Sequence, residues 1–429
     1  MLAYPSMKDS GVWWIGPIPQ GWALSKLKYV SEFAPKVSSV FNKDSPVGYV
    51  PMDCVRNGYM IPREALFSEM ETGLVRFQEG DIVMAKVTPC FENGNIAIGS
   101  GLSQRIAFGS SELFVFRSST IDQRYLFYYL QTQGFKQMCA ATMTGTAGLK
   151  RVSAYFVRNA PIPVPTTSDQ QRISSYLDDC CARIDTAIAE AKASIGEYKL
   201  LRQSVITQAV TKGLSPNAPM KHSGVEWIGE IPENWEVRKV KHYYNFQTGF
   251  TPDTRRQDYY DDMNGIDWVN ISDLSEDRII ENTKAKISSK YLKDYFPKII
   301  PNGSLLYSFK LSVGQVAFAG KDIYSNEAIA SFLPSNRYNL NFLYYSSFMI
   351  IKNANENIYG AKLLNQDLIK NAFIVFPPVL EQQQIADYLD RTCSDINAMI
   401  TEKQTTISDL ESYKKSLIYE VVTGKRRVA

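Results

Sequence analysis

The chain is poor in the residues on which many catalytic sites depend. Only two of its 429 residues are histidines, His222 and His242, so a histidine-based triad or a histidine-rich metal site has little support. None of its six cysteines forms a Cys-x-x-Cys pair, and free buried thiols are the expected state. A Gly-x4-Gly-Lys-Ser/Thr loop is absent as well, which argues against nucleotide hydrolysis. The sequence therefore favours binding over catalysis.

The sequence also lacks clear motifs for a methyltransferase or a nuclease, and it lacks the apolar segments of a membrane or secreted protein. No Asn-Pro-Pro-aromatic stretch indicates a base-methylating site. The letters "EAK" at Glu190–Lys192 match the end of a nuclease motif, but they fall in a heptad pattern, where such charges are usually solvated. No apolar run is long enough to span a bilayer, and the start lacks a secretory signal. We expect a cytoplasmic protein whose net charge of +3 permits nucleic-acid binding without demanding it.

The sequence contains one frame written twice. Residues 7–30 and 220–243 share 13 identical positions out of 24, including "SGV", "WIG", "IP" and a closing tryptophan. Residues 170–213 and 382–425 share 15 out of 44, including "QQ", "YLD" and "VT". The stretches between them, 31–147 and 244–359, have nearly equal length but little in common. A fixed frame around unlike inserts is typical of two modules of one fold that read different targets.

Each insert is predicted to be a compact α+β domain. "GDIVMAKV", "SELFVFRS", "GSLLYSF" and "AIASFLP" have the composition of short strands. "QRYLFYYLQTQGFKQM" and "LNFLYYSSFMIIKNA" have helical spacing of their apolar residues. The expected domains are residues 1–160 and 214–375, each followed by a repeated spacer helix, in residues 161–213 and 376–429.

The two spacer segments are predicted to be long amphipathic helices. Each follows a proline-rich stretch, "PIPVP" or "FPPVL", in which helix is disfavoured. Thr167 and Gln170 could form a capping box at the first helix start. Heptad stripes follow, with Ile173, Leu177, Ile184, Leu201 and others in the first helix and Ile385, Leu389, Met399, Tyr413 and others in the second. Since a helix of this length needs a partner for its stripe, we expect the two copies to pair antiparallel about a pseudo-twofold axis.

Polar and basic loops of the inserts are the candidate readers of a nucleic acid. Arg, Lys, Asn and Gln can bond base edges, and Lys and Arg also bind phosphates. Gly148/Lys150 and Gly360/Lys362 occupy matching positions in the two halves. The candidate residues are Lys86, Thr88, Asn93, Asn95, Thr144, Thr146, Lys150, Arg151, Thr251, Arg255, Arg256, Lys310, Gln315, Lys362 and Asn365. Any one of them could instead be an ordinary solvated loop residue.

The complete pattern resembles the specificity subunit of type I restriction–modification enzymes, the HsdS-type protein. The resemblance rests on "SGVxWIGxIPxxW" at the start of each half, "DQQRISSYLD" or "EQQQIADYLD" at each helix start, and "AVTKG" or "VVTGK" at each end. It covers essentially the whole chain. It implies two target recognition domains separated by two long antiparallel coiled-coil helices, in which each domain reads one half of a split, asymmetric DNA sequence.

The resemblance also implies partners. Two modification subunits would bind S-adenosylmethionine and methylate adenine in double-stranded DNA, and restriction subunits would add ATP-driven, Mg-dependent cleavage. This chain would be non-catalytic and hold no cofactor or metal itself. The candidate docking residues are Trp14, Trp22, Trp227, Trp235, Gln171, Tyr176, Gln383 and Tyr388. The four tryptophans are also expected to fasten the start of each domain to a helix end, with "VVTGK" beside the first copy.

Two other functions remain compatible with the residues alone. The chain could be a stand-alone sequence-specific DNA-binding protein, or a coiled-coil scaffold for other proteins. Neither of these explains why one frame encloses two unlike inserts in a single chain.

Overall fold

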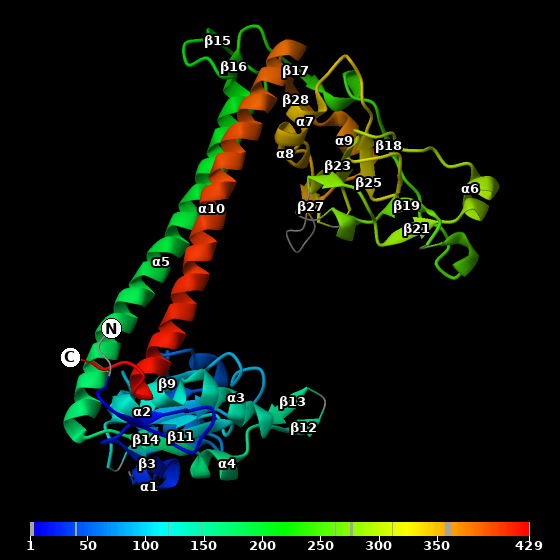
Figure 1. Cartoon of the computed structure of the whole chain (residues 1–429). Coiled ribbons are helices and arrows are strands. Elements are labelled where there is room, and N and C mark those ends of the chain that lie inside the picture. The colour runs from blue at the N-terminus through cyan, green and yellow to red at the C-terminus, as the bar shows by residue number, and fades with distance from the viewer. Residues whose placement is uncertain are drawn as a thin grey trace. The chain divides into compact units, whose positions relative to one another are not determined.

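The chain forms two compact units, which the computed structural model describes for residues 4–38, 41–118, 120–146, 148–261, 263–274, 278–310, 312–356 and 362–428. Unit 1 comprises Met1–Ala193 and Gln404–Ala429, and unit 2 comprises Ser194–Lys403. Unit 1 is therefore built from two stretches that lie far apart in the sequence. Figure 1 shows this in colour, since the red end of the chain lies within the blue and cyan unit.

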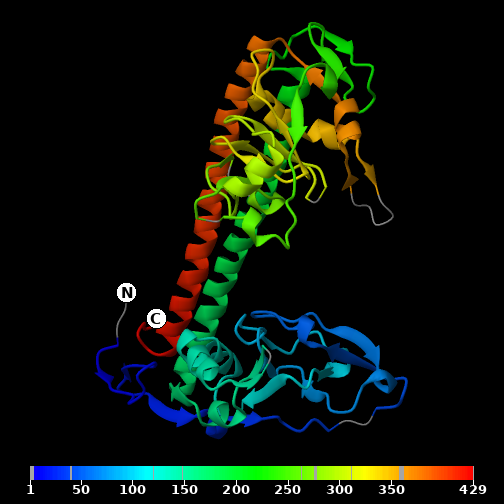
Figure 2. The same ribbon diagram turned by 90° about the vertical axis from the view of Figure 1, so that its right-hand side faces the viewer.

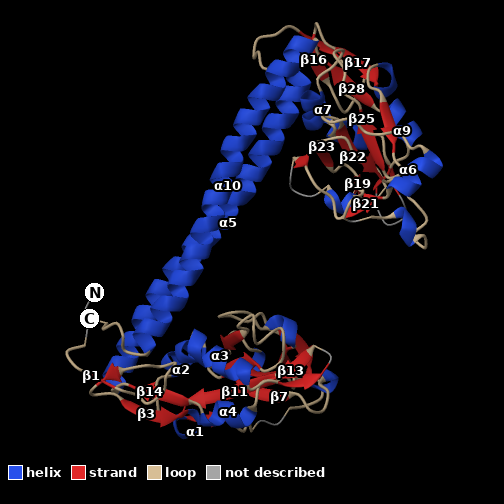
Figure 3. Ribbon diagram, turned by 45° about the vertical axis from the view of Figure 1, so that its right-hand side comes forward, coloured by secondary structure: helices blue, strands red, loops and turns tan. Residues whose placement is uncertain are grey.

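Two long helices, α5 (Thr167–Lys212) and α10 (Val379–Val422), contribute to both units. In unit 1, Ile173 and Leu177 from the start of α5 share a core with Val421 from the end of α10. In unit 2, Val210 from the end of α5 shares a core with Ile385 from the start of α10. These contacts confirm the predicted antiparallel pairing, which is visible as paired blue helices in Figure 3.

The predicted heptad stripe is correct at the helix ends but not throughout. Leu201, Met399 and Tyr413 were assigned to it, yet they are 48%, 44% and 49% exposed. A straight α-helix drifts by about 20° in each heptad relative to a strict seven-residue repeat. Over helices of 46 and 44 residues this drift carries some heptad positions away from the partner helix.

Unit 1 is built on two four-stranded sheets, ordered β6-β5-β10-β7 and β4-β11-β8-β9. Strands β5 and β10 pair parallel, and every other neighbouring pair is antiparallel. Two predicted strands are confirmed as β8 and β11, which pair with each other. The strands are β4 (Ser31–Phe33), β5 (Pro46–Val50), β6 (Arg63–Leu66), β7 (Val75–Gln78), β8 (Ile82–Ala85), β9 (Ile96–Ile98), β10 (Ile106–Gly109) and β11 (Leu113–Ser118).

Unit 2 contains a five-stranded sheet, ordered β18-β25-β22-β23-β20, and a three-stranded sheet, ordered β21-β19-β24. The predicted strands in "GSLLYSF" and "AIASFLP" are confirmed as β22 and β25, which lie side by side and are buried along their length. The strands are β18 (Phe246–Thr248), β19 (Ile266–Val269), β20 (Ile279–Ile280), β21 (Ala285–Ile287), β22 (Leu305–Ser308), β23 (Val316–Ala319), β24 (Tyr324–Ser325) and β25 (Ile329–Phe332).

Each apolar helical stretch of the inserts is divided into two helices. In unit 1 they are α2 (Gln123–Leu130) and α3 (Gln133–Ala141). The break lies at Thr132, whose hydroxyl donates to the carbonyl oxygen of Tyr129 at 2.8 Å and whose backbone is extended. In unit 2 they are α7 (Leu340–Ser346) and α8 (Phe348–Ile351). Helical spacing alone does not reveal such a break, because the apolar side chains continue across it.

The repeated frame closes each unit in the same way. The proline-rich strand β14 (Pro161–Val164) pairs antiparallel with β3 (Ala23–Lys26), and β28 (Phe373–Phe376) pairs antiparallel with β17 (Glu236–Lys239). The "SGVxWIGxIP" segments form small hairpins, β1 (Met7–Lys8) with β2 (Ile18–Pro19) and β15 (Met220–His222) with β16 (Glu230–Pro232). Together with the antiparallel helices, these pairs confirm the α+β fold class and the internal repeat.

The predicted capping box of the first long helix is wrong. Helix α5 begins at Thr167, so the residue before it, Thr166, is the cap. The Thr166 hydroxyl oxygen accepts a hydrogen bond from the Asp169 backbone N–H at 3.2 Å, and Oγ1 lies 2.9 Å from an Asp169 carboxylate oxygen. The side chain of Gln170, the second member of the predicted box, accepts the Asp122 N–H instead.

A search of the described ranges for a helix both long and apolar enough to cross a membrane finds none.

Candidate nucleic-acid interface

The paired lysines Lys150 and Lys362 lie on corresponding hairpins of the two units. Lys150 belongs to the hairpin of β12 (Thr144–Thr146) and β13 (Leu149–Arg151), whose strand residues are all exposed. Lys362 belongs to the hairpin of β26 (Asn355–Glu356) and β27 (Lys362–Leu363). In both units the hairpin follows the two insert helices, and Figure 1 shows β12 and β13 projecting from unit 1. Gly360, the predicted counterpart of Gly148, lies outside the described residues.

The base of the first hairpin is fastened by Thr88, which is only 9% exposed. Its hydroxyl donates to the Gly148 carbonyl oxygen at 2.8 Å and accepts from the Lys150 N–H at 2.9 Å. Its own N–H donates to the Lys150 carbonyl oxygen at 2.9 Å. Thr88 is therefore a positioning residue, and its prediction as a direct reader of bases is corrected by this burial. It joins the segment 85–95 to the hairpin.

An ion pair between Arg151 and Glu112 lies at the base of the same hairpin. The Arg151 guanidinium binds Glu112 through two hydrogen bonds of 2.8 and 2.9 Å. This pair lowers the pKa of the Glu112 carboxyl, with a smaller contribution from the nearby Lys86. The Lys86 ammonium lies 5.8 Å from the ring centroid of Phe114. Lys86, Lys150 and Arg151 therefore lie on backbone segments that bond each other, since the Val152 N–H donates to the Lys86 carbonyl oxygen at 2.8 Å and the Thr88 N–H to that of Lys150.

The other candidates in unit 1 flank this cluster. Thr144 and Thr146 are exposed on β12, and Asn93 is exposed in the segment that Thr88 fastens. Asn95 is half-buried, and its backbone N–H donates to the Cys90 carbonyl oxygen at 3.0 Å. These four residues remain candidates for contact with a ligand.

In unit 2, Glu327 brings Thr251 and Lys310 together. The Thr251 hydroxyl donates to the Glu327 carboxylate, and the Lys310 ammonium lies 3.4 Å from its other oxygen. The threonine hydrogen bond is the largest cause of the lowered pKa of Glu327. Gln315 is exposed nearby, and its backbone bonds Ser308 across the turn between β22 and β23.

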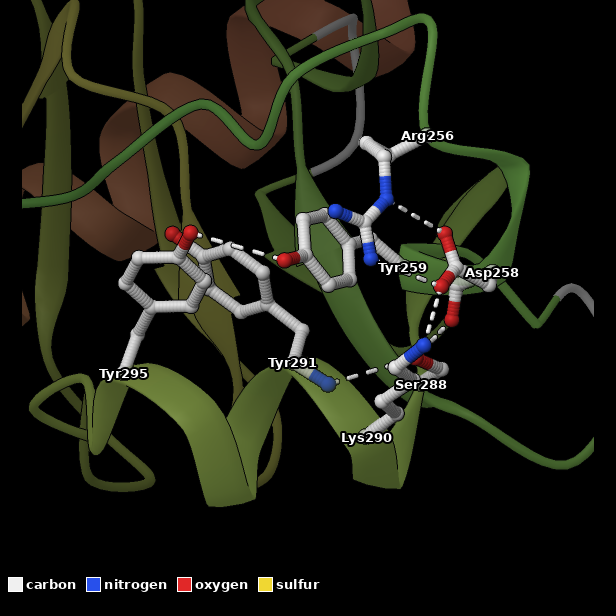
Figure 4. A network of polar contacts seen from close by, with 7 residues as sticks. All are labelled: Arg256, Asp258, Tyr259, Ser288, Lys290, Tyr291 and Tyr295. Atoms are coloured by element: carbon white, nitrogen blue, oxygen red, sulfur yellow. Dashed lines mark hydrogen bonds and ion pairs between the residues drawn. The ribbon is translucent and has the colours of Figure 1, made fainter.

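The two predicted arginines of unit 2 are both paired with aspartates two residues away. Arg255 bonds Asp253 at 3.0 and 3.1 Å, and Arg256 bonds Asp258 at 3.0 Å through two nitrogens. Arg256 also lies over the Tyr259 ring, 4.4 Å from its centroid. Figure 4 shows Arg256 and Lys290 converging on Asp258, whose pKa is lowered by Arg256 first and Lys290 second. These aspartates were missed, although "DTRRQD" shows the acids flanking the arginines.

Asn365 has a structural use that its sequence pattern concealed. Its side-chain oxygen accepts the Leu368 N–H at 2.8 Å and caps α9 (Gln366–Asn371). Ser153 does the same in unit 1 for α4 (Ala154–Asn159), accepting the Phe156 N–H at 3.3 Å. Asn365 is nevertheless exposed, and its cap uses only one lone pair of the side-chain oxygen, so it stays a candidate for DNA contact.

Three of the four repeated tryptophans are buried within their own units. Trp22 is 2%, Trp235 0% and Trp14 9% exposed, whereas Trp227 is 41% exposed. A Cβ on Gly424 would lie 3.2 Å from the Trp22 ring, and a Cβ on Gly213 would lie 3.2 Å from the Trp235 ring. Trp22 and Trp235 therefore fasten helix ends, as predicted. Because the rings of Trp14, Trp22 and Trp235 are buried within their own units, the prediction that they dock a partner is corrected. Among the four tryptophans, only Trp227 remains a docking candidate.

The end of α10 lies beside the first copy of the repeated segment, which confirms the predicted contact. The Lys425 ammonium donates to the carbonyl oxygens of Ile15 and Pro17, and the Tyr419 hydroxyl donates to Ile15 at 3.2 Å. Figure 2 shows the red C-terminal segment next to the blue N-terminal one in unit 1. Burial lowers the pKa of Lys425 to about 8. In unit 2 the helix at the corresponding place is α5, and the chain runs from its end at Lys212 directly to β15 of the second repeated segment.

The "QQ" motif serves the fold through its first glutamine. Gln170 is buried, accepts from the Asp122 N–H at 2.7 Å and donates to the Pro165 carbonyl oxygen at 2.8 Å. Gln382 makes the same pair of bonds in unit 2, to Asn339 and Pro377, both at 2.8 Å. Each glutamine thereby ties the start of a long helix to the start of an insert helix.

The aspartate of the "YLD" motif makes a second repeated contact. Asp178 accepts from Tyr128 at 2.7 Å and pairs with Arg124, and Asp390 accepts from Tyr345 at 2.6 Å and pairs with Arg278. The predicted docking residues beside these buried positions remain at the surface. Gln171, Gln383 and Tyr388 are exposed, and Tyr176 is half-buried.

Comparison with known proteins identifies the repeated frame. The family model described as the type I restriction modification DNA specificity domain matches residues 19–205 and 232–408. The EcoAI specificity subunit of Escherichia coli is 31% identical over 239 residues, which is 54% of this chain but 38% of that protein. The putative MjaX specificity subunit of Methanocaldococcus jannaschii is 24% identical over 432 residues, 96% of each chain.

Solved structures share the fold. A chain in a structure of the type I R-M system has a TM-score of 0.75 and 19% identity, with coverage of 94% of this chain and 98% of that one. The HsdS subunit from Thermoanaerobacter tengcongensis has a TM-score of 0.55 and 18% identity, with coverage of 95% and 98%. Since the family model matches both halves, the chain belongs to the type I restriction–modification DNA specificity family.

Proposed function

We propose that this chain is the DNA sequence-specificity subunit of a type I restriction–modification complex, and that each unit reads one half of an asymmetric, bipartite target. The observation that carries the proposal is the repeated frame around unlike inserts. Lys150 and Lys362 occupy corresponding hairpins, while the side chains around them differ between the units. Equivalent positions with different surroundings are what two readers of different sequences require.

The proposal includes the partners named by the resemblance. Two modification subunits would dock on exposed surface of the frame, for which Trp227, Gln171, Gln383 and Tyr388 are the candidates. Restriction subunits would join the same complex, which we place in the cytoplasm. In this proposal the chain itself is non-catalytic. S-adenosylmethionine, ATP and Mg would be bound by the partner subunits.

The chemistry of the candidate surfaces supports a duplex as the ligand. The exposed hairpin of unit 1 carries Lys150 and Arg151, and the loops of unit 2 carry Arg255, Arg256 and Lys310. Several of these cations are held by carboxylates in the free chain. Exchange of such a carboxylate for a phosphate or a guanine edge keeps two hydrogen bonds to each arginine.

Co-expression with the neighbouring modification subunit, followed by mapping of methylated adenines, tests the proposal. The expected result is one asymmetric motif with two specified parts separated by unspecified bases. A palindromic motif would contradict two unlike readers. Tight sequence-specific binding by the purified chain alone, without any effect of the modification subunit, would favour a stand-alone DNA-binding protein. Absence of duplex binding even in the assembled complex would favour a scaffold.

A further inference from the structure

Helix α6 (Ser289–Tyr295) of unit 2 ends in an exposed aromatic edge that the recognition loops do not explain. Tyr295 is 58% and Phe296 is 82% exposed, although they are adjacent in sequence. Single exposed apolar residues are common on protein surfaces. Two neighbouring aromatic rings directed to solvent are less easily explained in that way, and their setting shows three further features.

The first feature is the backbone of Phe296, which is left-handed with φ 47° and ψ 51°. Glycine usually occupies this position after a helix, because an ordinary side chain there costs about 1 kcal/mol. The Phe296 N–H donates to the Leu292 carbonyl oxygen at 3.0 Å, and Pro297 follows. The phenylalanine ring is thus held at the end of a capped helix, in a strained conformation of the kind that clusters at binding sites.

The second feature is a cluster of packed rings that includes Tyr295, the residue before Phe296. Tyr291 stacks on Phe250 with centroids 4.9 Å apart and on Tyr295 with centroids 4.6 Å apart. Tyr259 meets both tyrosines edge-on, and its hydroxyl lies 3.4 Å from that of Tyr295. Figure 4 shows Tyr259, Tyr291 and Tyr295 gathered beside Arg256. Tyr295, one of the two residues of the exposed edge, is therefore held in place by packing against other rings.

The third feature is charge. Residues 284–298 contain five lysines and one aspartate, and Lys293 and Lys298 flank the aromatic pair at exposed positions. The edge is also connected to the loop that carries the candidates Arg255 and Arg256, because the Ser288 hydroxyl donates to the Asp258 carbonyl oxygen at 2.7 Å and Lys290 pairs with Asp258. Lysine is depleted at protein–protein contacts, whereas it complements the phosphates of a duplex.

We infer that Phe296 is a wedge that inserts between two base pairs of the half-site read by unit 2, from the minor groove, with the flanking lysines on the phosphates. Apolar wedges of this kind unstack one base step and bend the duplex. This inference rests on the proposed function. It adds a source of sequence preference that needs no hydrogen bond, because pyrimidine–purine steps are the easiest to open.

The test uses the chain assembled with its modification subunit and a duplex carrying the mapped motif, with 2-aminopurine placed singly along both half-sites. We expect the fluorescence of the bound wild-type complex to rise at one step, confined to one half-site. Phe296→Ala should abolish that rise and weaken binding roughly 5- to 150-fold, the range for loss of one stacking contact. Phe296→Met should retain the rise, because methionine also serves as a wedge. Probes in the other half-site are the internal control.

The outcomes separate this inference from the proposed function. If the wild-type complex binds and methylates its motif but no probe responds, or if Phe296→Ala keeps the response, the wedge is refuted while the specificity function stands. If Phe296→Ala instead loses association with the modification subunit, the edge is a protein contact and the inference is wrong. If the wild-type complex shows no sequence-specific methylation, the proposed function itself fails. A thermal melt of each variant verifies that it is folded.

Discussion

Replacement of Gln382 by alanine should destabilise unit 2 far more than replacement of its neighbour Gln383. The Gln382 side chain is 0% exposed and makes two bonds of 2.8 Å, with the Asn339 N–H and the Pro377 carbonyl oxygen. Truncation leaves both backbone groups without their partner. Each such group costs about 1–3 kcal/mol, so the two together should cost about 2–6 kcal/mol, and we take about 3 kcal/mol from the lower half of that range.

Gln383 provides the matched control because it has the same chemistry at the next position. It is exposed and bonds only side chains, those of Asn339 and Asp387. Its truncation should cost less than about 1 kcal/mol, as exposed polar contacts do. The two substitutions remove the same number of atoms from the same helix, so helix propensity cancels in the comparison.

Hydrogen exchange measured by mass spectrometry distinguishes the two variants locally. In Gln382→Ala, protection should fall in the peptide that contains Asn339 and in the first turns of α10, by roughly 100-fold for about 3 kcal/mol. Urea denaturation followed by tryptophan fluorescence should show an earlier transition. Equal loss of protection in the two variants, or a loss below about 1 kcal/mol in Gln382→Ala, would refute the claim that this glutamine joins the helix to the insert.

Three further predictions concern unit 1 and the hairpins. Because the folded pKa of Lys425 is about 8, below the usual 10.4 of the unfolded chain, the unfolded state binds more protons between these values. The free energy of unfolding should therefore increase as the pH rises through this window. Lys425→Met should remove this increase, which is measured by denaturation at several pH values. Gly424→Ala would place a Cβ 2.2 Å from a proline ring, whereas the Cβ of Gly11→Ala meets nothing within 4 Å at a similar φ. In thermal melts Gly424→Ala should therefore lower the stability by at least about 2 kcal/mol more than Gly11→Ala. Equal losses would show that the clash is relieved. Lys150→Ala and Lys362→Ala should weaken methylation of target DNA more than assembly with the modification subunit in pull-downs, and equal losses would show that these lysines are structural.

The frame could be predicted from the sequence because its physical requirements repeat. Proline-rich strands, apolar helical periodicity and paired tryptophans occur at the same spacing in both halves, and the strand pairs β3–β14 and β17–β28 correspond. The paired lysines were found for the same reason. When the same residue recurs at the same spacing in both halves, the two positions can be recognised as equivalent, which is not possible for a loop residue that occurs once.

The parts that could not be predicted depend on geometry finer than a sequence pattern. Gln170 and Gln171 are the same residue, but a rotation of about 100° on the helix buries one and exposes the other. Thr88 and Asn365 carry groups that could bond a base, yet both bond the chain's own backbone, because short polar side chains compete for such local partners.

The contacts that Asp178 and Asp390 each make with the insert of their own unit illustrate a further limit of prediction from the sequence. Arg124 reaches Asp178 from α2, whereas Arg278 reaches Asp390 from the segment before β20. The two arginines do the same work from unrelated positions, so no alignment of the halves pairs them. Once the Asp and Tyr partners are fixed, any arginine that the fold brings into range can complete the contact.

The discontinuity of unit 1 has a consequence for the order in which the protein is made on the ribosome. Residues 1–193 leave the exit tunnel before unit 2 does, but residues 404–429, which complete the core of unit 1 with Leu417 and Val421, are translated after unit 2. Unit 2 is continuous, from Ser194 to Lys403, and can close before residues 404–429 are made. The nascent chain must therefore carry the uncovered apolar face of α5, including Ile173 and Leu177, through the synthesis of the whole second unit. Unit 1 is thus the unit whose synthesis begins first and whose core is completed last, once residues 404–429 have left the tunnel.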